Sequence, residues 1–593
     1  MKRHSSFSAF RNRFISRRQI GALLLILSAG LVCPLLTACA PSHTTSPPGP
    51  KPPPPSTTTT LAQDPSTSAP VSFEDITVQA GLNFKQSSGA CGMRYFVEQV
   101  ASGAAILDAN GDGNLDVFFP QPKALGACKG KIHEKLRSRL YLGDGKGHFT
   151  LAKDPFGGVE TDYGIAAAVG DFDNDGRPDL YVCCFGKNKL FHNNGDGTFK
   201  DVTAKAGVEV GGFSTGAVWF DYDGDGLLDL YVLRYCEWSV ETDIPCLGPN
   251  GERDNCSPHI YTPARNRLFH NNGNGTFTDV TAKAGVSPEP RRSLGVAAID
   301  IDGDGKLDLF VANDLGPNYL MHNKGDGTFE DIGMQQGVSV GADGHHQANM
   351  GVAVGDYNNT GRPSVLVTTF ANEPFTLYRN EGGFFTDVSE EVGIAAPTKP
   401  YLAFGTGFLD TRNSGRLDLF FANGHVSPFA YLKNSMYTYK ERNQLLILGD
   451  TGIYSEAKEA LPKDDVRIHR GAVFGDFDND GRTDILVTAT DDRPTLMRNK
   501  TEGGNWLTLK LTSANGCCTP IGTKCTATFK GRKLTRWEIG GGSYGGDSDQ
   551  RVHFGLGNAD KVDELEIKWM SGKVQTLKDV KVNQILSIKE PKP

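Results

Sequence analysis

Five short stretches of the chain carry oxygen-bearing side chains on alternate residues, with a glycine after the third of them. The stretch at 171–179 reads DFDNDGRPD, and close copies begin at Asp108, Asp221, Asp300 and Asp476. Carboxylates at this spacing repel one another, so an ordered loop this acidic needs a cation at its centre. Oxygen ligands at positions 1, 3, 5, 7 and 9, with glycine at position 6, are typical of a calcium-binding loop.

We predict about five structural Ca2+ sites, each with four side-chain ligands and the backbone carbonyl of position 7. The predicted ligands are Asp108, Asn110, Asp112, Asn114 and Asp116; Asp171, Asp173, Asp175, Arg177 and Asp179; Asp221, Asp223, Asp225, Leu227 and Asp229; Asp300, Asp302, Asp304, Lys306 and Asp308; and Asp476, Asp478, Asp480, Arg482 and Asp484. Position 12 of the second loop is Val182, where an EF-hand has glutamate, and short apolar runs flank the loop. The loop therefore joins two strands. An acidic surface turn without metal is the alternative interpretation.

Two further copies have lost ligands. DYNNTGRPS, from Asp356, lacks three carboxylates, and DTRNSGRLD, from Asp410, places Arg412 at a ligand position. A guanidinium at that position can replace an ion, so we expect both loops to fold without metal. The total is then seven acidic loops along the chain.

A second phrase follows the acidic loop in several repeats. It reads LFHNNGDGTF from Leu190 and LFHNNGNGTF from Leu268, with two strand-like runs around an Asn/Gly turn, which predicts a hairpin. Each unit thus supplies four strands, and seven such units predict an all-β fold, a seven-bladed β-propeller over 71–500. The run FEDITV at 73–78 is a last strand with no unit before it, so we expect it to complete the last blade and close the ring.

Small residues precede each loop at one fixed position. They are Gly103, Ala166, Gly216, Gly295, Gly351, Gly405 and Gly471. We expect only small side chains to fit where the innermost strands converge on one axis.

The first residues predict export. Residues 1–38 carry six basic and no acidic side chains and the apolar run IGALLLILSAGLV, which indicates a signal peptide. Leu36–Cys39 resembles a bacterial lipobox, so Cys39 is the predicted lipidation site, and residues 39–70 are a Pro/Ser/Thr-rich tether. We expect an exported protein held at the cell envelope only by its lipid anchor. The route, Sec or twin-arginine (SRRQIG), and the membrane face stay open, although Ala40 favours the outer membrane.

Charge and cysteines fit this location. The formal net charge is −8 and no basic stripe is present, so we expect no nucleic-acid partner. Export makes disulfides the default, and we predict Cys246–Cys256 and Cys91–Cys128. In the vicinal pairs Cys183–Cys184 and Cys517–Cys518 we expect one cysteine in the core and the other in a disulfide.

These motifs together resemble the FG-GAP/VCBS repeat family joined to an ASPIC/UnbV domain, as in bacterial relatives of cartilage acidic protein. The repeats cover about 73–500, and the phrase SDQRVHFGLG at 548–557 resembles the ASPIC/UnbV pattern, which makes 501–593 a small C-terminal β domain. In FG-GAP relatives such as the integrin head, the resemblance implies structural calcium in the loops and a propeller surface that binds protein partners.

We therefore expect a calcium-stabilised scaffold that binds a protein or glycan at the cell envelope, with no catalytic residues. The alternative is an exported enzyme or small-molecule binder at the mouth of the propeller channel. Its candidate residues are Glu98, Asp162, Arg292, Asn349, His469 and Arg470, with His345, His346 and His425 in loops. No hydrolase, zinc-protease or phosphate-binding motif supports that alternative.

Overall fold

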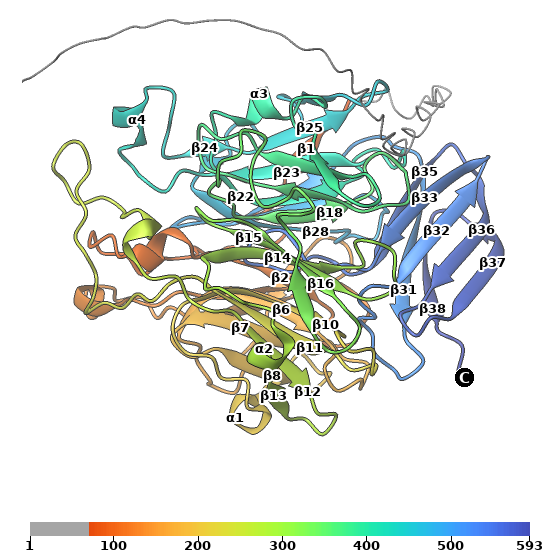
Figure 1. Cartoon of the computed structure of the whole chain (residues 1–593), viewed down its shortest axis with the longest axis horizontal. Coiled ribbons are helices and arrows are strands. Elements are labelled where there is room, and N and C mark those ends of the chain that lie inside the picture. The colour runs from red at the N-terminus through yellow and green to blue at the C-terminus, as the bar shows by residue number, and fades with distance from the viewer. Residues whose placement is uncertain (1–69, 593) are drawn as a thin grey trace, which may run out of the picture. The chain divides into compact units, whose positions relative to one another are not determined.

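The computed structural model describes residues 70–592. The predicted signal peptide (1–38), Cys39 and nearly all of the predicted tether (39–70) lie outside these residues. Within them, strands dominate, and seven antiparallel sheets follow one another along the chain with four repeat strands each (Figure 1). The prediction of an all-β, seven-bladed propeller followed by a small β domain is confirmed. Among the described residues, no helix is long and apolar enough to cross a membrane.

The blades take their strands in chain order, from the innermost strand outward. Blade 1 has β2 (Ala105–Leu107), β3 (Asp116–Phe119), β4 (Arg139–Gly143) and β5 (Phe149–Leu151); blade 2 has β6 (Tyr163–Gly170), β7 (Asp179–Phe185), β8 (Lys189–Asn193) and β9 (Phe199–Asp201); blade 3 has β10 (Ser214–Phe220), β11 (Asp229–Arg234), β12 (Arg267–Asn271) and β13 (Phe277–Asp279). Blade 4 has β14 (Ser293–Ile299), β15 (Asp308–Asn313), β16 (Tyr319–Asn323) and β17 (Phe329–Asp331); blade 5 has β18 (Val352–Gly355), β19 (Ser364–Val367), β20 (Thr376–Asn380) and β21 (Phe385–Asp387). Blade 6 has β22 (Ala403–Leu409), β23 (Asp418–Asn423), β25 (Gln444–Leu448) and β26 (Tyr454–Glu456); blade 7 has β28 (His469–Gly475), β29 (Asp484–Ala489), β30 (Thr495–Asn499) and β1 (Phe73–Asp75).

The remaining elements of the propeller are short. They are η2 (Phe96–Gln99), η3 (Gly126–Cys128), η4 (Pro258–Ile260), α1 (Thr203–Ala206), α2 (Thr281–Ala284), α3 (Ala395–Thr398), α4 (Ala430–Lys433) and the paired strands β24 (Glu441–Arg442) and β27 (Val466–Arg467).

The ring of blades is closed by β1. This strand pairs antiparallel with β30, with Phe73 opposite Asn499, so the last blade contains a strand from the other end of the repeat region. Each innermost strand contacts the next around the ring, and β28 contacts β2. Closure leaves no blade without a neighbour on either side.

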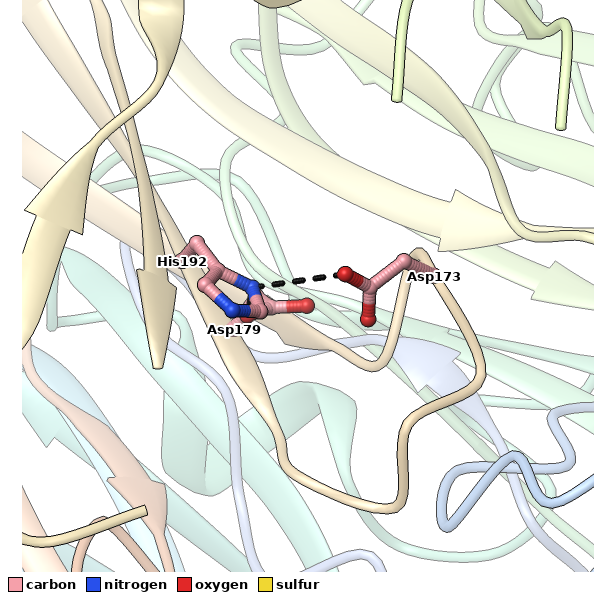
Figure 2. Close-up of side chains that lie close together, drawn as sticks. All are labelled: Asp173, Asp179 and His192. Carbon is pink, nitrogen blue, oxygen red and sulfur yellow. Dashed lines mark ion pairs between the residues drawn. The ribbon is translucent and has the colours of Figure 1, made fainter. Parts of the chain in front are cut away.

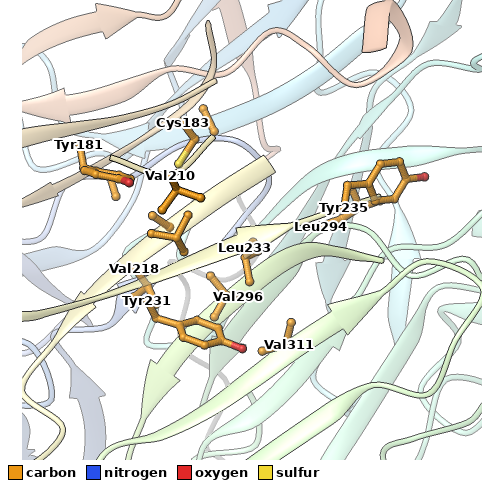
Figure 3. Packing of buried hydrophobic residues seen from close by; sticks show 14 of the residues in the cluster. Tyr181, Cys183, Val210, Val218, Tyr231, Leu233, Tyr235, Leu294, Val296 and Val311 are labelled. Carbon is orange, nitrogen blue, oxygen red and sulfur yellow. The ribbon is translucent and has the colours of Figure 1, made fainter. Parts of the chain in front are cut away.

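Both faces of a blade are packed against neighbouring blades. Two adjacent cysteines on one strand are therefore both buried in the core. Cys183 packs with Tyr181 and Tyr231 in one hydrophobic cluster, and Cys184 packs in the next (Figure 3). The alternation along β7 is as expected, but both sides of this strand are core. The expectation that one cysteine of each pair forms a disulfide is wrong, since Cys183, Cys184, Cys517 and Cys518 are all free. The two predicted disulfides, Cys91–Cys128 and Cys246–Cys256, are both present.

The C-terminal domain has a hydrophobic core of its own between two sheets. Its strands are β31 (Asn505–Thr512), β32 (Lys524–Phe529), β33 (Arg532–Trp537), β35 (Val552–Gly557), β36 (Lys561–Lys568), β37 (Val574–Lys581) and β38 (Gln584–Lys589). Between β33 and β35 the chain leaves this domain and enters the propeller.

Residues 540–549, here called the channel segment, occupy the centre of the ring. Its strand β34 (Gly540–Gly541) pairs with β14, and the Ser543 hydroxyl donates to the Ala472 carbonyl of β28 at 2.6 Å. A Cβ atom on Gly103 would lie 1.9 Å from the Gly545 carbonyl oxygen. The small residue at this position is thus required by the channel segment and not only by neighbouring strands.

Candidate metal centres

The acidic loops all join the innermost strand of a blade to its second strand, so they lie on one face of the propeller. We number them 1 to 7 by blade, with first residues Asp108, Asp171, Asp221, Asp300, Asp356, Asp410 and Asp476. In loop 2 the Asp171 carboxylate accepts the amides of Asp175 and Gly176, each at 3.0 Å. Gly176 has φ +85°, a conformation that favours glycine, which explains its fixed place in the sequence.

The last aspartate of a loop links it to the hairpin of the same blade. Asp179 is fully buried, and its two oxygens accept the amides of Phe172 at 3.2 Å and Asn193 at 2.8 Å. Burial raises the pKa of Asp179 to about 7 and that of the equivalent Asp229 to about 9. The same pair of backbone donors serves Asp116, Asp229, Asp308 and Asp484. This residue therefore fixes the hairpin over the loop.

The predicted carboxylate ligands do come together. One oxygen from each of Asp171, Asp173 and Asp175 lies within 4.8 Å of the others, and loop 3 gathers its first three aspartates in the same way. At position 7, where the sequence predicts a carbonyl ligand, the amide of the residue donates to the carboxylate at position 5. This holds for Asn114, Arg177, Leu227, Lys306 and Arg482. These amide-to-carboxylate hydrogen bonds fold each loop around its own carboxylates.

In three of these clusters the carboxylates are joined by a histidine that is absent from the predicted ligands. His192 of β8 points at loop 2, with Nδ1 3.4 Å from Asp173 Oδ2 and 3.2 Å from Asp179 Oδ1 (Figure 2). His270 and His322 take the same place in blades 3 and 4. The available signal is the histidine of the hairpin phrase, which stands three residues before the turn glycine (Gly195, Gly273 and Gly325) in all three blades.

Other blades have protein cations near the loop. In loop 7, Arg498 forms an ion pair with Asp478, and Arg482 pairs with Asp480. In loop 6, whose ligands the sequence shows as damaged, Arg412 lies 3.7 Å from Asp418, so a guanidinium stands among its carboxylates.

The C-terminal domain covers the face that carries the loops. The Cys518 amide donates to Asp171 Oδ2 at 3.0 Å, and Lys510 Nζ lies 3.5 Å from Asp108. Trp506 packs over Gly481 of loop 7, where a Cβ atom would meet the indole at 1.8 Å. Loops 1, 2 and 7 are therefore part of the contact between the propeller and this domain.

The candidate residues of the channel mouth lie at the opposite end of the innermost strands. Three of them come together: the Arg470 guanidinium donates to the Gly424 carbonyl at 2.7 Å and to the His425 carbonyl at 3.5 Å, and His469 Nδ1 lies 2.9 Å from the Asn423 carbonyl. Burial lowers the pKa of His425 to about 4. His345 and His346 are exposed on a separate loop. The other candidates form hydrogen bonds elsewhere. Asp162 accepts the Lys187 amide, Arg292 donates to the Tyr261 carbonyl, and Asn349 donates to the Asn313 carbonyl. Burial raises the pKa of Glu98 to about 7.

Three insertions cover this mouth, and we call them together the cap: residues 84–103, 235–266 and 425–443. They bond to one another, since Ser427 Oγ donates to Asp254 Oδ2 at 2.7 Å and the Arg94 guanidinium lies over the Phe429 ring at 5.8 Å. Arg470 Nε, from β28, donates to the Gln99 carbonyl of the cap at 2.7 Å. The channel is thus covered at this end and filled by the channel segment from the other.

Comparison with known proteins identifies the two parts of the chain. The FG-GAP-like repeat matches at 108–182, 171–232, 259–311 and 300–367, and the domain described as ASPIC and UnbV matches at 518–593. Cartilage acidic protein 1 of Xenopus tropicalis is 26% identical over 521 residues, covering 83% of this chain and 74% of that protein, and that of Homo sapiens is 25% identical over 526 residues, covering 83% and 73%. Among solved structures, Saccharomyces cerevisiae Sqt1 matches with a TM-score of 0.35 and 10% identity, covering 73% of this chain and 98% of that chain.

Proposed function

Because this chain is an FG-GAP repeat protein with a C-terminal ASPIC/UnbV domain, an architecture that cartilage acidic protein 1 shares, we propose that it is a binding scaffold at the cell envelope. In this proposal the protein is exported and held by a lipid on Cys39, calcium occupies the acidic loops, and the propeller binds a protein or glycan.

The observation that carries the binding role is the filled channel. Tyr544 of the channel segment reaches Val100 of the cap, and the Phe404 ring packs against Tyr544 at 4.8 Å between centroids. Small-molecule sites are usually concave pockets. At the capped end of this channel a ligand meets the outer surface, which favours recognition of a macromolecule at that end.

The cap offers the more apolar part of that surface. Large hydrophobic side chains on two of its insertions are exposed: Ile244, Leu247, Ile260, Tyr431, Leu432 and Met436. Exposed apolar groups gathered on one surface commonly mark a protein-binding site. We therefore place the partner on the cap, away from the C-terminal domain.

Calcium supports this scaffold in the proposal. Loops 2 and 3 each bring three carboxylate oxygens together, the donor type that Ca2+ prefers. Outside the cytoplasm calcium can approach millimolar concentrations, so even weak sites fill. Loop 1, with Asn110 in place of aspartate, is expected to bind most weakly.

The test uses the mature chain, immobilised through its N-terminal end, against envelope proteins and an array of glycans. We expect one saturable ligand, whose binding the double variant Leu432→Glu/Met436→Glu abolishes. Val574→Glu is the matched control, because Val574 is exposed on the C-terminal domain, and it should bind like the wild type. Equal binding by both variants would contradict the cap as the binding surface. A melting temperature that is the same with and without a calcium chelator would contradict the role of calcium.

A further inference from the structure

The fourth residue of the third strand occupies an equivalent place in every blade, and its chemistry differs around the ring. In blade order these residues are Leu142, His192, His270, His322, Arg379, Ile447 and Arg498. Imidazole therefore occurs only in blades 2, 3 and 4, and all three of these blades have complete acidic loops.

The three histidines present the same atom to the same two carboxylates. Nδ1 lies 3.4, 3.3 and 3.5 Å from the position-3 aspartates Asp173, Asp223 and Asp302. It lies 3.2 Å from the position-9 aspartate in each blade. In blades 2 and 3, Nδ1 is buried from solvent yet forms no hydrogen bond with good geometry to any described residue. In blade 4, His322 Nδ1 lies within hydrogen-bonding distance of Asp308 Oδ1. The same ring nitrogen is thus aimed between two carboxylates in three independent repeats.

We propose that loops 2, 3 and 4 are mixed carboxylate–imidazole sites that bind a first-row transition-metal ion of the zinc class, with Nδ1 of His192, His270 and His322 as a direct ligand. This inference rests on the proposed function, because it concerns the same acidic loops. It assigns loops 2, 3 and 4 a different metal preference from the other intact loops. Calcium favours oxygen ligands alone, whereas imidazole nitrogen raises the affinity of a site for transition-metal ions. These loops therefore prefer such an ion to calcium.

Loops 1 and 7 provide the contrast. Leu142 has no donor atom, so loop 1 keeps an all-oxygen set. Arg498 has no lone pair to offer a metal, and its guanidinium pairs with the buried Asp478. The same position thus supplies a ligand in three blades, nothing in one, and a competing positive charge in another.

The experiment titrates the metal-stripped mature chain separately with ZnCl2 and CaCl2 by calorimetry. The triple variant His192→Leu/His270→Leu/His322→Leu introduces the residue that blade 1 carries naturally. We expect Zn2+ affinity at three sites to fall at least about tenfold, because even the loss of a hydrogen-bond partner of a metal ligand costs that much, and Ca2+ affinity to change little. Circular dichroism checks that the variant is folded.

A second variant decides the question even if the triple variant fails to fold. Arg498→His places imidazole over the intact carboxylates of loop 7, and it should add a fourth Zn2+ site. Arg379→His is the matched control, because loop 5 has lost three carboxylates, and it should add none.

The proposal is overturned if Zn2+ binding is the same in the wild type and the folded triple variant, or if Arg498→His and Arg379→His behave alike. Either result leaves calcium binding, and so the proposed function, untouched. Absence of Ca2+ binding at every loop would instead contradict the calcium part of the proposed function, whatever the zinc titration shows.

Discussion

The Tyr544 hydroxyl donates a hydrogen bond to the backbone carbonyl of Val100 at 2.6 Å. Tyr544 belongs to the channel segment, which enters the ring from the side of the acidic loops, and Val100 belongs to the cap at the other end. Both residues are almost completely buried. This bond therefore ties the C-terminal domain to the far end of the propeller through its centre.

Replacing Tyr544 with phenylalanine should destabilise the protein, since the Val100 carbonyl would be left buried without this donor. The expected loss is about 1–3 kcal/mol in the free energy of unfolding, the usual cost of an unsatisfied buried polar group. The midpoint of urea denaturation measures it. Tyr431→Phe serves as the control, because Tyr431 is 55% exposed, and its midpoint should match the wild type. Equal midpoints for both variants would show that the Tyr544 bond contributes nothing.

The close approach of the channel segment to blade 1 can be tested with one methyl group. In Gly103→Ala the new Cβ would lie 1.9 Å from the Gly545 carbonyl oxygen and 2.7 Å from that of Ile165. Both neighbours are backbone atoms that cannot rotate away, so we expect a loss of at least about 1–3 kcal/mol. Thermal unfolding of Gly211→Ala, where nothing lies within 4 Å of the new Cβ, is the control. A melting temperature equal to that of Gly211→Ala would mean that the channel segment does not fill this space.

The blades and loops could be predicted from the sequence because each repeat encodes its own local structure. The spacing of Asp171, Asp173 and Asp175, with Gly176 at the turn, fixes the loop, and the Asn/Gly turn fixes the hairpin. Seven repetitions then leave few folds available. The alternation of Cys183 and Cys184 along β7 also followed from the sequence.

The rest depends on contacts between distant residues. The glycine-rich run at 540–546 indicates only an irregular backbone. Its pairing with β14 and its hydrogen bond to β28 form when the segment enters the ring, and the sequence does not reveal them. The histidine at 192 reaches loop 2 because Asp179 bonds to the Asn193 amide, a register that the phrase LFHNN does not reveal. The burial of both Cys183 and Cys184 likewise depends on neighbouring blades.

The buried Glu441 should make stability depend on pH. Burial raises the pKa of its carboxyl from the ordinary value to about 8, so the folded state favours the neutral acid. The stability that this shift contributes is fully present below the unfolded pKa of about 4.5 and is lost as the pH rises towards 8. The loss is about 1.4 kcal/mol for each unit by which the folded and unfolded pKa values differ.

Glu441→Gln removes this titration, so its stability relative to the wild type should increase between pH 5 and pH 8. Denaturation midpoints of both proteins across this range measure the difference. Glu502→Gln alters an exposed carboxyl, so the denaturation midpoint of this control should change with pH in the same way as that of the wild type. A constant difference between Glu441→Gln and the wild type would show that Glu441 is ionised in the folded protein throughout.

The free cysteines should differ in reactivity according to their burial. Cys183, Cys184, Cys236 and Cys525 are buried in the folded protein, whereas Cys518 is partly exposed. Burial raises the pKa of both the Cys183 and the Cys518 thiol, so access of the reagent, and not thiolate content, sets the order of labelling. We expect N-ethylmaleimide at neutral pH to label Cys518 first and to leave Cys183 and Cys184 unmodified, as peptide mapping by mass spectrometry would show. The same reaction in guanidinium chloride should label all of them, while equal labelling of Cys183 and Cys518 in the native protein would contradict the packing of blade 2 between its neighbours.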